Sequence, residues 1–143
     1  MSFLTSFNIS ANGMSAERLR INVIASNIAN INTTRTPEGG PYRRKDVVFE
    51  AVPVDNKENS FENQLQLETV KVKDIVEDNR PPILKYDPSH PDADKNGYVK
   101  MPNINLMEEM VNLINASRSY EANVQVMRSA KNMLMRTIEL LRI

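Results

Sequence analysis

The 143-residue chain lacks several features that would assign it quickly to a functional class. It has no cysteine, which excludes disulfides and thiolate chemistry but leaves the compartment open, because cysteine-free chains occur on both sides of a membrane. Eighteen basic residues balance eighteen acidic ones, so no excess positive charge is available to bind a phosphate backbone. Nucleic acid is therefore not an expected partner.

Long apolar segments are also lacking. No stretch approaches the ~20 apolar residues of a membrane-spanning helix, so we expect a protein that is not membrane-inserted. The opening MSFLTSFNIS has neither the basic start nor the continuous apolar core of a cleaved signal peptide. If the protein leaves the cytoplasm, we expect another route to carry it.

Groups that could form an active site are scarce. His90 is the only histidine, and neither a second histidine nor a cysteine is present to share a metal. Glu108 and Glu109 are explained by the start of a helix, and the sequence has no nucleophile elbow or phosphate-binding glycine loop. The sequence therefore predicts no enzyme activity, no catalytic residue, no metal, no cofactor and no small-molecule substrate.

One segment, DADKNGYVKMPN at residues 92–103, partly matches a calcium-binding loop. The matching residues, at the first, third, fifth and sixth positions of an EF-hand loop, are Asp92, Asp94, Asn96 and Gly97. The match fails at the twelfth position, which is Asn103 instead of a bidentate glutamate. A turn at Asn96-Gly97 explains the same residues. A calcium-responsive adaptor is therefore only a second hypothesis.

Both ends of the chain have helical patterns. Near the N-terminus, Phe7, Met14, Ile21 and Ile28 recur every seven residues, and Asn32 can end the helix. Gly13 would cost a helix interior about 1 kcal/mol relative to alanine, so the helix is expected to be bent or conditional there. The C-terminal series of sevens is Leu106, Leu113, Tyr120, Met127, Leu134 and Leu141, with Met110, Val124 and Ile138 as companions in a coiled-coil seam. Asn105 is the expected N-cap, with Glu108 completing a capping box and Arg142 in the last turn.

The C-terminal helix has a second apolar face, well away from this seam. It consists of Met107, Val111, Ile114, Val126, Met133 and Leu140. Burial of each side chain is worth roughly 1.5–3 kcal/mol. Large apolar patches seldom stay exposed on monomers. Either the middle segment folds over this face, or neighbouring molecules cover it.

Asparagines recur in the N-terminal helix although asparagine is a poor helix-interior residue. Neutral amides can pair across an interface without desolvating a charge, and an unpartnered buried amide costs about 1–3 kcal/mol, which penalises wrong registers. We therefore expect Asn27 and Asn30 to set register in an assembly. The alternative is that they are ordinary exposed polar residues.

The middle of the chain holds all eight prolines and has no helical period. KDVVFEAVPV and ETVKVKDIVE have strand patterns, and the polar DNKENSFENQ joins them. The sequence therefore predicts a mainly α fold with a small β part. An N-terminal helix spans residues 1–32, a short β-hairpin and loop segment 33–104, and a C-terminal helix 105–143, with the two helices pairing as a coiled coil.

Two segments carry a family likeness. NGMSAERLRINVIASNIANINTT resembles the N-terminal signature of the bacterial flagellar axial proteins, which build the rod, hook and hook-filament junction, and EEMVNLINASRSYEANVQVM resembles their C-terminal helix. Most rod and hook relatives continue with Gly-Tyr-Lys where this chain has Arg35-Thr36-Pro37. With YDPSHPDADKNGYVKMPNIN, that departure resembles a proximal-rod member of the family, over nearly the whole chain.

The resemblance implies a structural subunit of the basal-body rod, the drive shaft across the periplasm, exported uncleaved by the flagellar type III apparatus. It implies terminal helices that are disordered before assembly and then stack with copies of the chain, other rod proteins and the adaptor at the rod base. Another axial or adaptor subunit is the alternative. The expected assembly interface comprises Phe7, Met14, Ile21, Asn27, Ile28, Asn30, Met110, Leu113, Tyr120, Val124, Met127, Leu134, Ile138 and Leu141.

Overall fold

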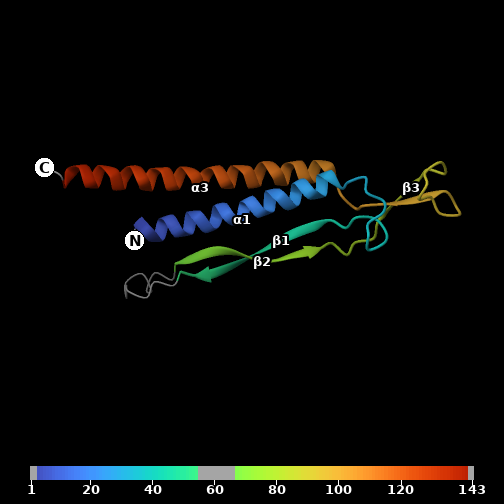
Figure 1. Cartoon of the computed structure of the whole chain (residues 1–143), viewed down its shortest axis with the longest axis horizontal. Helices are drawn as coiled ribbons and strands as arrows, with labels where there is room; N and C mark the ends of the chain where they lie inside the picture. Colours follow the sequence, from blue (N-terminus) through green and yellow to red (C-terminus); the bar gives the residue numbers. More distant parts are fainter. Residues whose placement is uncertain (1–2, 55–66, 142–143) are drawn as a thin grey trace.

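The structure is a computed structural model that describes residues 3–54 and 67–141 (Figure 1). Two long helices, α1 (Phe3–Ala29) and α3 (Leu106–Leu140), flank two antiparallel hairpins. Strand β1 (Lys45–Pro53) pairs with β2 (Glu68–Glu77), and β3 (Ile83–Tyr86) pairs with β4 (Tyr98–Met101). The prediction of a mainly helical fold with a small β part between the terminal helices is confirmed.

Helix α1 forms the middle layer of an elongated molecule. It lies between α3 and the β1–β2 hairpin, while the β3–β4 hairpin projects beyond the end where α1 finishes and α3 begins (Figure 1). At the opposite end, α3 extends past the start of α1 (Figure 1). The last turns of α3 therefore have no described helix beside them.

Gly13 does not interrupt α1, which is a single helix from Phe3 to Ala29. A Cβ atom placed on Gly13 would lie 3.0 Å from Nδ2 of Asn123 on α3. This spacing is tighter than most Cβ contacts, so the missing side chain allows the two helices to approach closely. The helix contact offsets the poor helix propensity of glycine.

The start of α3 is capped by Asn105, as predicted. Its side chain accepts a hydrogen bond from the backbone amide of Met107 at 3.0 Å, which satisfies one of the free amides of the first turn. The bond goes to Met107 rather than to Glu108, the position that a capping box would use. The predicted role of Arg142 lies outside the described residues.

Strands β1 and β2 lie where the alternating pattern predicts them. Lys45 pairs with Glu77 at one end and Pro53 with Glu68 at the other, with a bulge between Val48 and Phe49. The segment that was expected to join them lies outside the described residues. Two contacts join the hairpin to α1. Nδ2 of Asn12 donates to Oγ1 of Thr69 at 3.1 Å, and the guanidinium of Arg20 lies over the ring of Phe49, 5.7 Å from its centroid.

The β3–β4 hairpin was not predicted. Each strand has only four residues, and the rings of Tyr86 and Tyr98 meet edge to face with centroids 5.3 Å apart. Gly97 has φ +81°, and a Cβ there would lie 2.9 Å from the ring of Tyr86. Glycine is therefore required at this turn both for its backbone conformation and for space.

Candidate assembly surfaces

The face of α3 that contacts α1 is lined by small or polar side chains. Glu109, Ala116, Asn123 and Ala130 recur every seven residues, and Glu109, Ala116 and Ala130 are 1%, 0% and 3% exposed. Glu109 contacts Asn27, and Asn123 contacts Gly13, so the two contacts lie two seven-residue intervals apart on both helices. The helices therefore keep one antiparallel register along this line.

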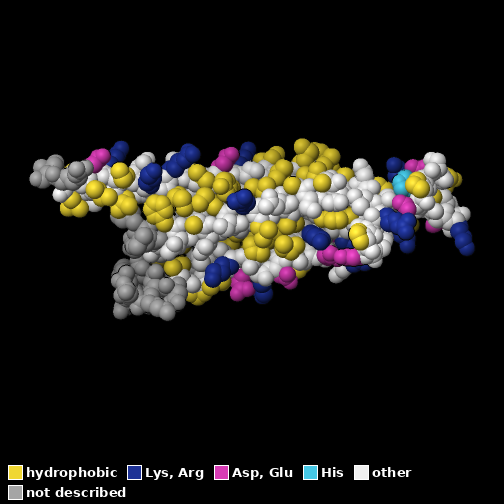
Figure 2. Space-filling view, viewed as in Figure 1, with side chains coloured by type: hydrophobic (Ala, Val, Ile, Leu, Met, Phe, Trp, Pro, Cys, Tyr) yellow, Lys and Arg dark blue, Asp and Glu magenta, His cyan; other side chains and the backbone are white. Residues whose placement is uncertain are grey.

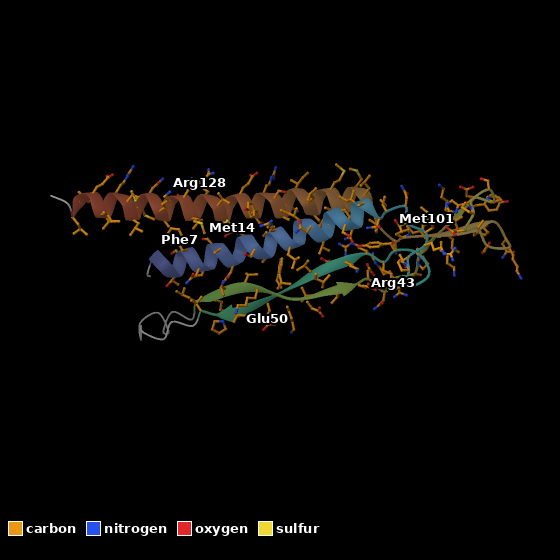
Figure 3. The ribbon with its side chains drawn as sticks, viewed as in Figure 1. Phe7, Met14, Arg43, Glu50, Met101 and Arg128 are labelled. Carbon is orange, nitrogen blue, oxygen red and sulfur yellow. The ribbon has the colours of Figure 1, made fainter. Side chains whose placement is uncertain are left out.

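The predicted seam residues flank this line instead of forming it. Figure 3 shows Phe7 and Met14 on the side of α1 towards α3. Eight of the predicted residues are half-buried: Phe7, Met14, Ile21, Ile28, Leu113, Tyr120, Val124 and Met127. Met110, Leu134, Ile138 and Leu141 are exposed. The positions of α3 that line the contact with α1 each lie three residues after a member of the predicted series of sevens that begins at Leu106. The predicted companion residues each lie four residues after a member of that series.

A partly buried polar cluster joins α1, α3 and the start of β1, and we call it the junction cluster: Asn27, Tyr42, Arg44, Lys45 and Glu109. Nδ2 of Asn27, which is fully buried, donates to the Lys45 carbonyl at 2.8 Å and to Oε2 of Glu109 at 3.0 Å. Its Oδ1 accepts from the Lys45 amide at 2.9 Å and from the Tyr42 hydroxyl at 3.2 Å.

Arg44 holds the other side of Glu109. Its Nε donates to Oε1 of Glu109 at 2.7 Å, and its Nη1 donates to Asp46 at 3.0 Å. Burial alone would lower the pKa of Arg44, but the hydrogen bonds and charges of Glu109 and Asp46 outweigh it and raise that pKa above its usual value. The guanidinium therefore stays charged and neutralises a carboxylate removed from water.

The described hydrogen bonds of Asn27 and Asn30 lie within the chain, and the expectation that these amides set register in an assembly stays a prediction. Every donor and acceptor site of the Asn27 amide is used within its own chain. Nδ2 of Asn30 donates to the Ser26 carbonyl at 2.9 Å, and its Oδ1 accepts from the Thr33 hydroxyl at 3.2 Å. Asn27 fixes register inside the subunit, and Asn30 closes the end of α1.

The second apolar face of α3 is uncovered in the described part of the chain. Its members, Met107, Val111, Ile114, Val126, Met133 and Leu140, are each 50–73% exposed. The β1–β2 hairpin packs on α1, on the side away from α3, so it does not fold over this face (Figure 1). Hydrophobic side chains gather over the first turns of α3 in Figure 2. The described part of the middle segment therefore does not cover the second apolar face of α3.

The acidic residues of the calcium-like segment form a turn. Oδ1 of Asp94 accepts from the amides of Asn96 at 2.8 Å and Tyr98 at 2.9 Å, and Asp92 accepts from the hydroxyl of Thr34. Among residues 3–54 and 67–141, no three acidic or histidine side chains are placed to hold a metal ion. In the same ranges, no helix is long and apolar enough to cross a membrane.

Paired terminal helices, an uncovered apolar face and an elongated shape are the architecture of a subunit from a larger assembly. Family models for "Flagella basal body rod protein" and "Flagellar basal body rod FlgEFG protein C-terminal" match residues 7–35 and 95–140. The chain is 45% identical to the flagellar basal-body rod protein FlgC of Borreliella burgdorferi, with 99% of each chain covered. It is 41% identical to FlgC of Salmonella typhimurium, with 98% of each chain covered, and 40% identical to that of Bacillus subtilis.

The chain therefore belongs to the FlgC family of flagellar basal-body rod proteins. This confirms the resemblance to the flagellar axial proteins and its proximal-rod branch. A different axial subunit and a calcium-responsive adaptor are not favoured.

Proposed function

We propose that this chain is a structural subunit of the proximal rod in the bacterial flagellar basal body. It assembles helically with copies of itself and with other rod proteins, next to the adaptor at the rod base, and forms part of the shaft that transmits torque across the periplasm. Its role is mechanical, without catalysis or a cofactor. The flagellar export apparatus delivers it without cleavage of a signal peptide.

The exposure of the second apolar face of α3, which we call the outer face, is the observation that carries this proposal. Six large apolar side chains at 50–73% exposure are a poor surface for a protein that works alone in water. If neighbours bury them, each contributes roughly 1.5–3 kcal/mol before the entropy of association is subtracted. In a helical tube, each subunit has neighbours along the tube axis and around its circumference.

The expected interface residues have two roles in this proposal. The half-buried residues, such as Met14 and Met127, complete the contact between α1 and α3 within one copy. The exposed residues Met110, Leu134, Ile138 and Leu141, together with the outer face, meet neighbouring subunits. Residues 1–32 and 105–143 then act as the axial part, and residues 33–104 as the part that faces outward.

The test is a lysine on the outer face. Ile114→Lys places a charge on a half-exposed position, so the single chain tolerates it, but a neighbour packed there would bury the charge without a partner. We expect Ile114→Lys to abolish incorporation into purified basal bodies and swimming, with unchanged far-UV circular dichroism of the isolated chain.

Ile114→Leu is the matched control, because it keeps an apolar side chain of the same volume at the same position of α3 and adds no charge. It should retain incorporation and motility. Normal motility of Ile114→Lys would count against the use of this face in assembly. Val111→Lys repeats the test one turn earlier if the first variant loses helix content.

A further inference from the structure

Helix α3 presents several methionines to solvent. Met107, Met110, Met133 and Met135 are 68%, 46%, 53% and 50% exposed, and we call them the exposed methionines. We propose that they are a reversible oxidation site of the unassembled subunit: hydrogen peroxide converts their thioethers to sulfoxides, and the oxidised helix no longer packs on a neighbouring subunit. The effect on packing rests on the proposed function, whereas the oxidation itself does not.

The other described methionines are less accessible. Met14 and Met127 are half-buried beside the contact between α1 and α3, and Figure 3 shows Met14 on the side of α1 towards α3. By contrast, Met107 and Val111 line an open hollow on the outer face, which a small oxidant reaches directly from solvent. Oxidation of a sulfur-containing side chain follows its exposure. The structure therefore separates a reactive set of methionines from a protected set in the same chain.

The reaction uses only the methionine sulfur and the peroxide. A lone pair of the thioether attacks one oxygen of hydrogen peroxide, and an S–O bond forms as the O–O bond breaks. After proton transfer, the second oxygen leaves as water. The sulfur is oxidised by two electrons and the peroxide is reduced. Methionine sulfoxide reductases, one for each sulfoxide epimer, reverse the change, so the modification is not a permanent lesion.

Oxidation turns an apolar side chain into a polar one. On the free chain, the exposed methionines already lie in water, so a sulfoxide oxygen there is hydrated and the fold loses no buried contact. Against a neighbouring subunit, the same oxygen would be removed from water, and a polar group buried without a hydrogen-bond partner is unfavourable. Oxidation should therefore lower assembly while leaving the stability of the single subunit nearly unchanged.

The composition of the outer face makes this effect separable from packing in general. Met107 and Met133 are its oxidisable members, whereas its other members are valine, isoleucine and leucine, which peroxide does not attack. Leucine has about the volume of methionine and lacks the sulfur. Replacing the two methionines by leucine therefore keeps the face apolar and removes its sensitivity to the oxidant.

Peptide mass spectrometry of the purified full-length chain, sampled during treatment with hydrogen peroxide, tests the site. Sulfoxide should form at each exposed methionine about three times faster or more than at Met14 or Met127. Methionine sulfoxide reductases of both epimer specificities, supplied with a dithiol, should remove it. Urea unfolding of the oxidised chain should match that of the untreated chain.

Substitutions that imitate the sulfoxide test the effect on assembly. Met107→Gln combined with Met133→Gln places a permanent polar amide at two positions of the outer face, and Met107→Leu combined with Met133→Leu is the matched apolar control. We expect the glutamine variant to be incorporated into purified basal bodies about tenfold less than the leucine variant. The far-UV circular dichroism of the two isolated chains should be the same.

Two results would overturn the proposal: oxidation of Met14 or Met127 as fast as that of the exposed methionines, or equal incorporation of the glutamine and leucine variants. If the double glutamine variant loses helix content, Met133→Gln alone repeats the test against Met133→Leu. Ile114→Lys separates these results from the proposed function. If Ile114→Lys blocks incorporation and the glutamine variant does not, the oxidation proposal fails alone. If both are incorporated normally, the proposed use of the outer face fails as well.

Discussion

The two ends of α3 differ in whether their backbone and side-chain groups find partners within the chain. At the first end, Asn105 caps the helix, and Glu109 is buried between Asn27 of α1 and Arg44, the residue before β1. At the last end, Leu140 and Leu141 are exposed, and the last described turn carries no basic residue that would complement the helix dipole. One helix thus combines a long part, from Glu109 to Ala130, that packs on α1 and last turns whose side chains are left exposed. A single helix can therefore carry both the contacts that complete the fold of one subunit and the apolar side chains that this subunit leaves uncovered.

The largest effect on the stability of the free chain should come from a larger side chain at the contact between α1 and α3. Ala116 is 0% exposed, so Ala116→Leu forces α1 and α3 apart and should lower the free energy of unfolding by about 1–3 kcal/mol or more. Urea unfolding of the isolated chain, followed by far-UV circular dichroism, measures it. Ala122→Leu is the control, because Ala122 is exposed on the same helix and should be nearly neutral. Equal effects of the two substitutions would remove the distinction between the two faces of α3.

A smaller effect is expected at the cap. Asn105→Ala removes the acceptor for the Met107 amide and should lower the free energy of unfolding by about 1 kcal/mol. Thr137→Ala is the counterpart at the open end, where the Thr137 hydroxyl bonds only the Met133 carbonyl of its own helix. It should change stability by less than about 0.5 kcal/mol. If Thr137→Ala proved the more damaging in urea unfolding, the open end would be more ordered than the comparison states.

The smallest effect on the free chain should come from the tip itself. Leu141 is 81% exposed, so Leu141→Ser should leave the free energy of unfolding unchanged within about 0.5 kcal/mol. The same variant should lower incorporation into basal bodies, because the proposal buries this side chain against a neighbour. A clear loss of stability in the isolated chain would show that the tip is already packed.

Elements with a simple period were predictable from the sequence. The alternating Val70 and Val72 gave β2, the recurring Met14 and Ile21 gave α1, and Asn105 marked the start of α3, because each signal is local. The exposed second face of α3 was also visible in the spacing. The β3–β4 hairpin was missed because four-residue strands are too short to establish a period.

The helix contact and the junction cluster were harder to predict. Large apolar residues dominate any search for a periodic apolar pattern. The contact between α1 and α3 is instead made by Ala116, Ala130 and Gly13, small residues that add little to such a pattern. The seven-residue recurrence of small and polar residues from Glu109 to Ala130 was the signal available. Burial of Glu109 depends on Asn27 and Arg44, which are distant in sequence, and a helix start already explained an acidic residue there. No local rule connects these three residues.

The extension of α3 past the start of α1 gives the molecule a direction. One end presents a single helix and the other a projecting hairpin, so copies stacked the same way up bring unlike ends together (Figure 1). Such heterologous contacts are not self-complementary as those of a two-fold dimer are, and they continue into an open series wherever the rotation between copies does not close a ring. Polarity along the axis, and with it a distinction between the base and the growing end, is therefore already present in the single chain.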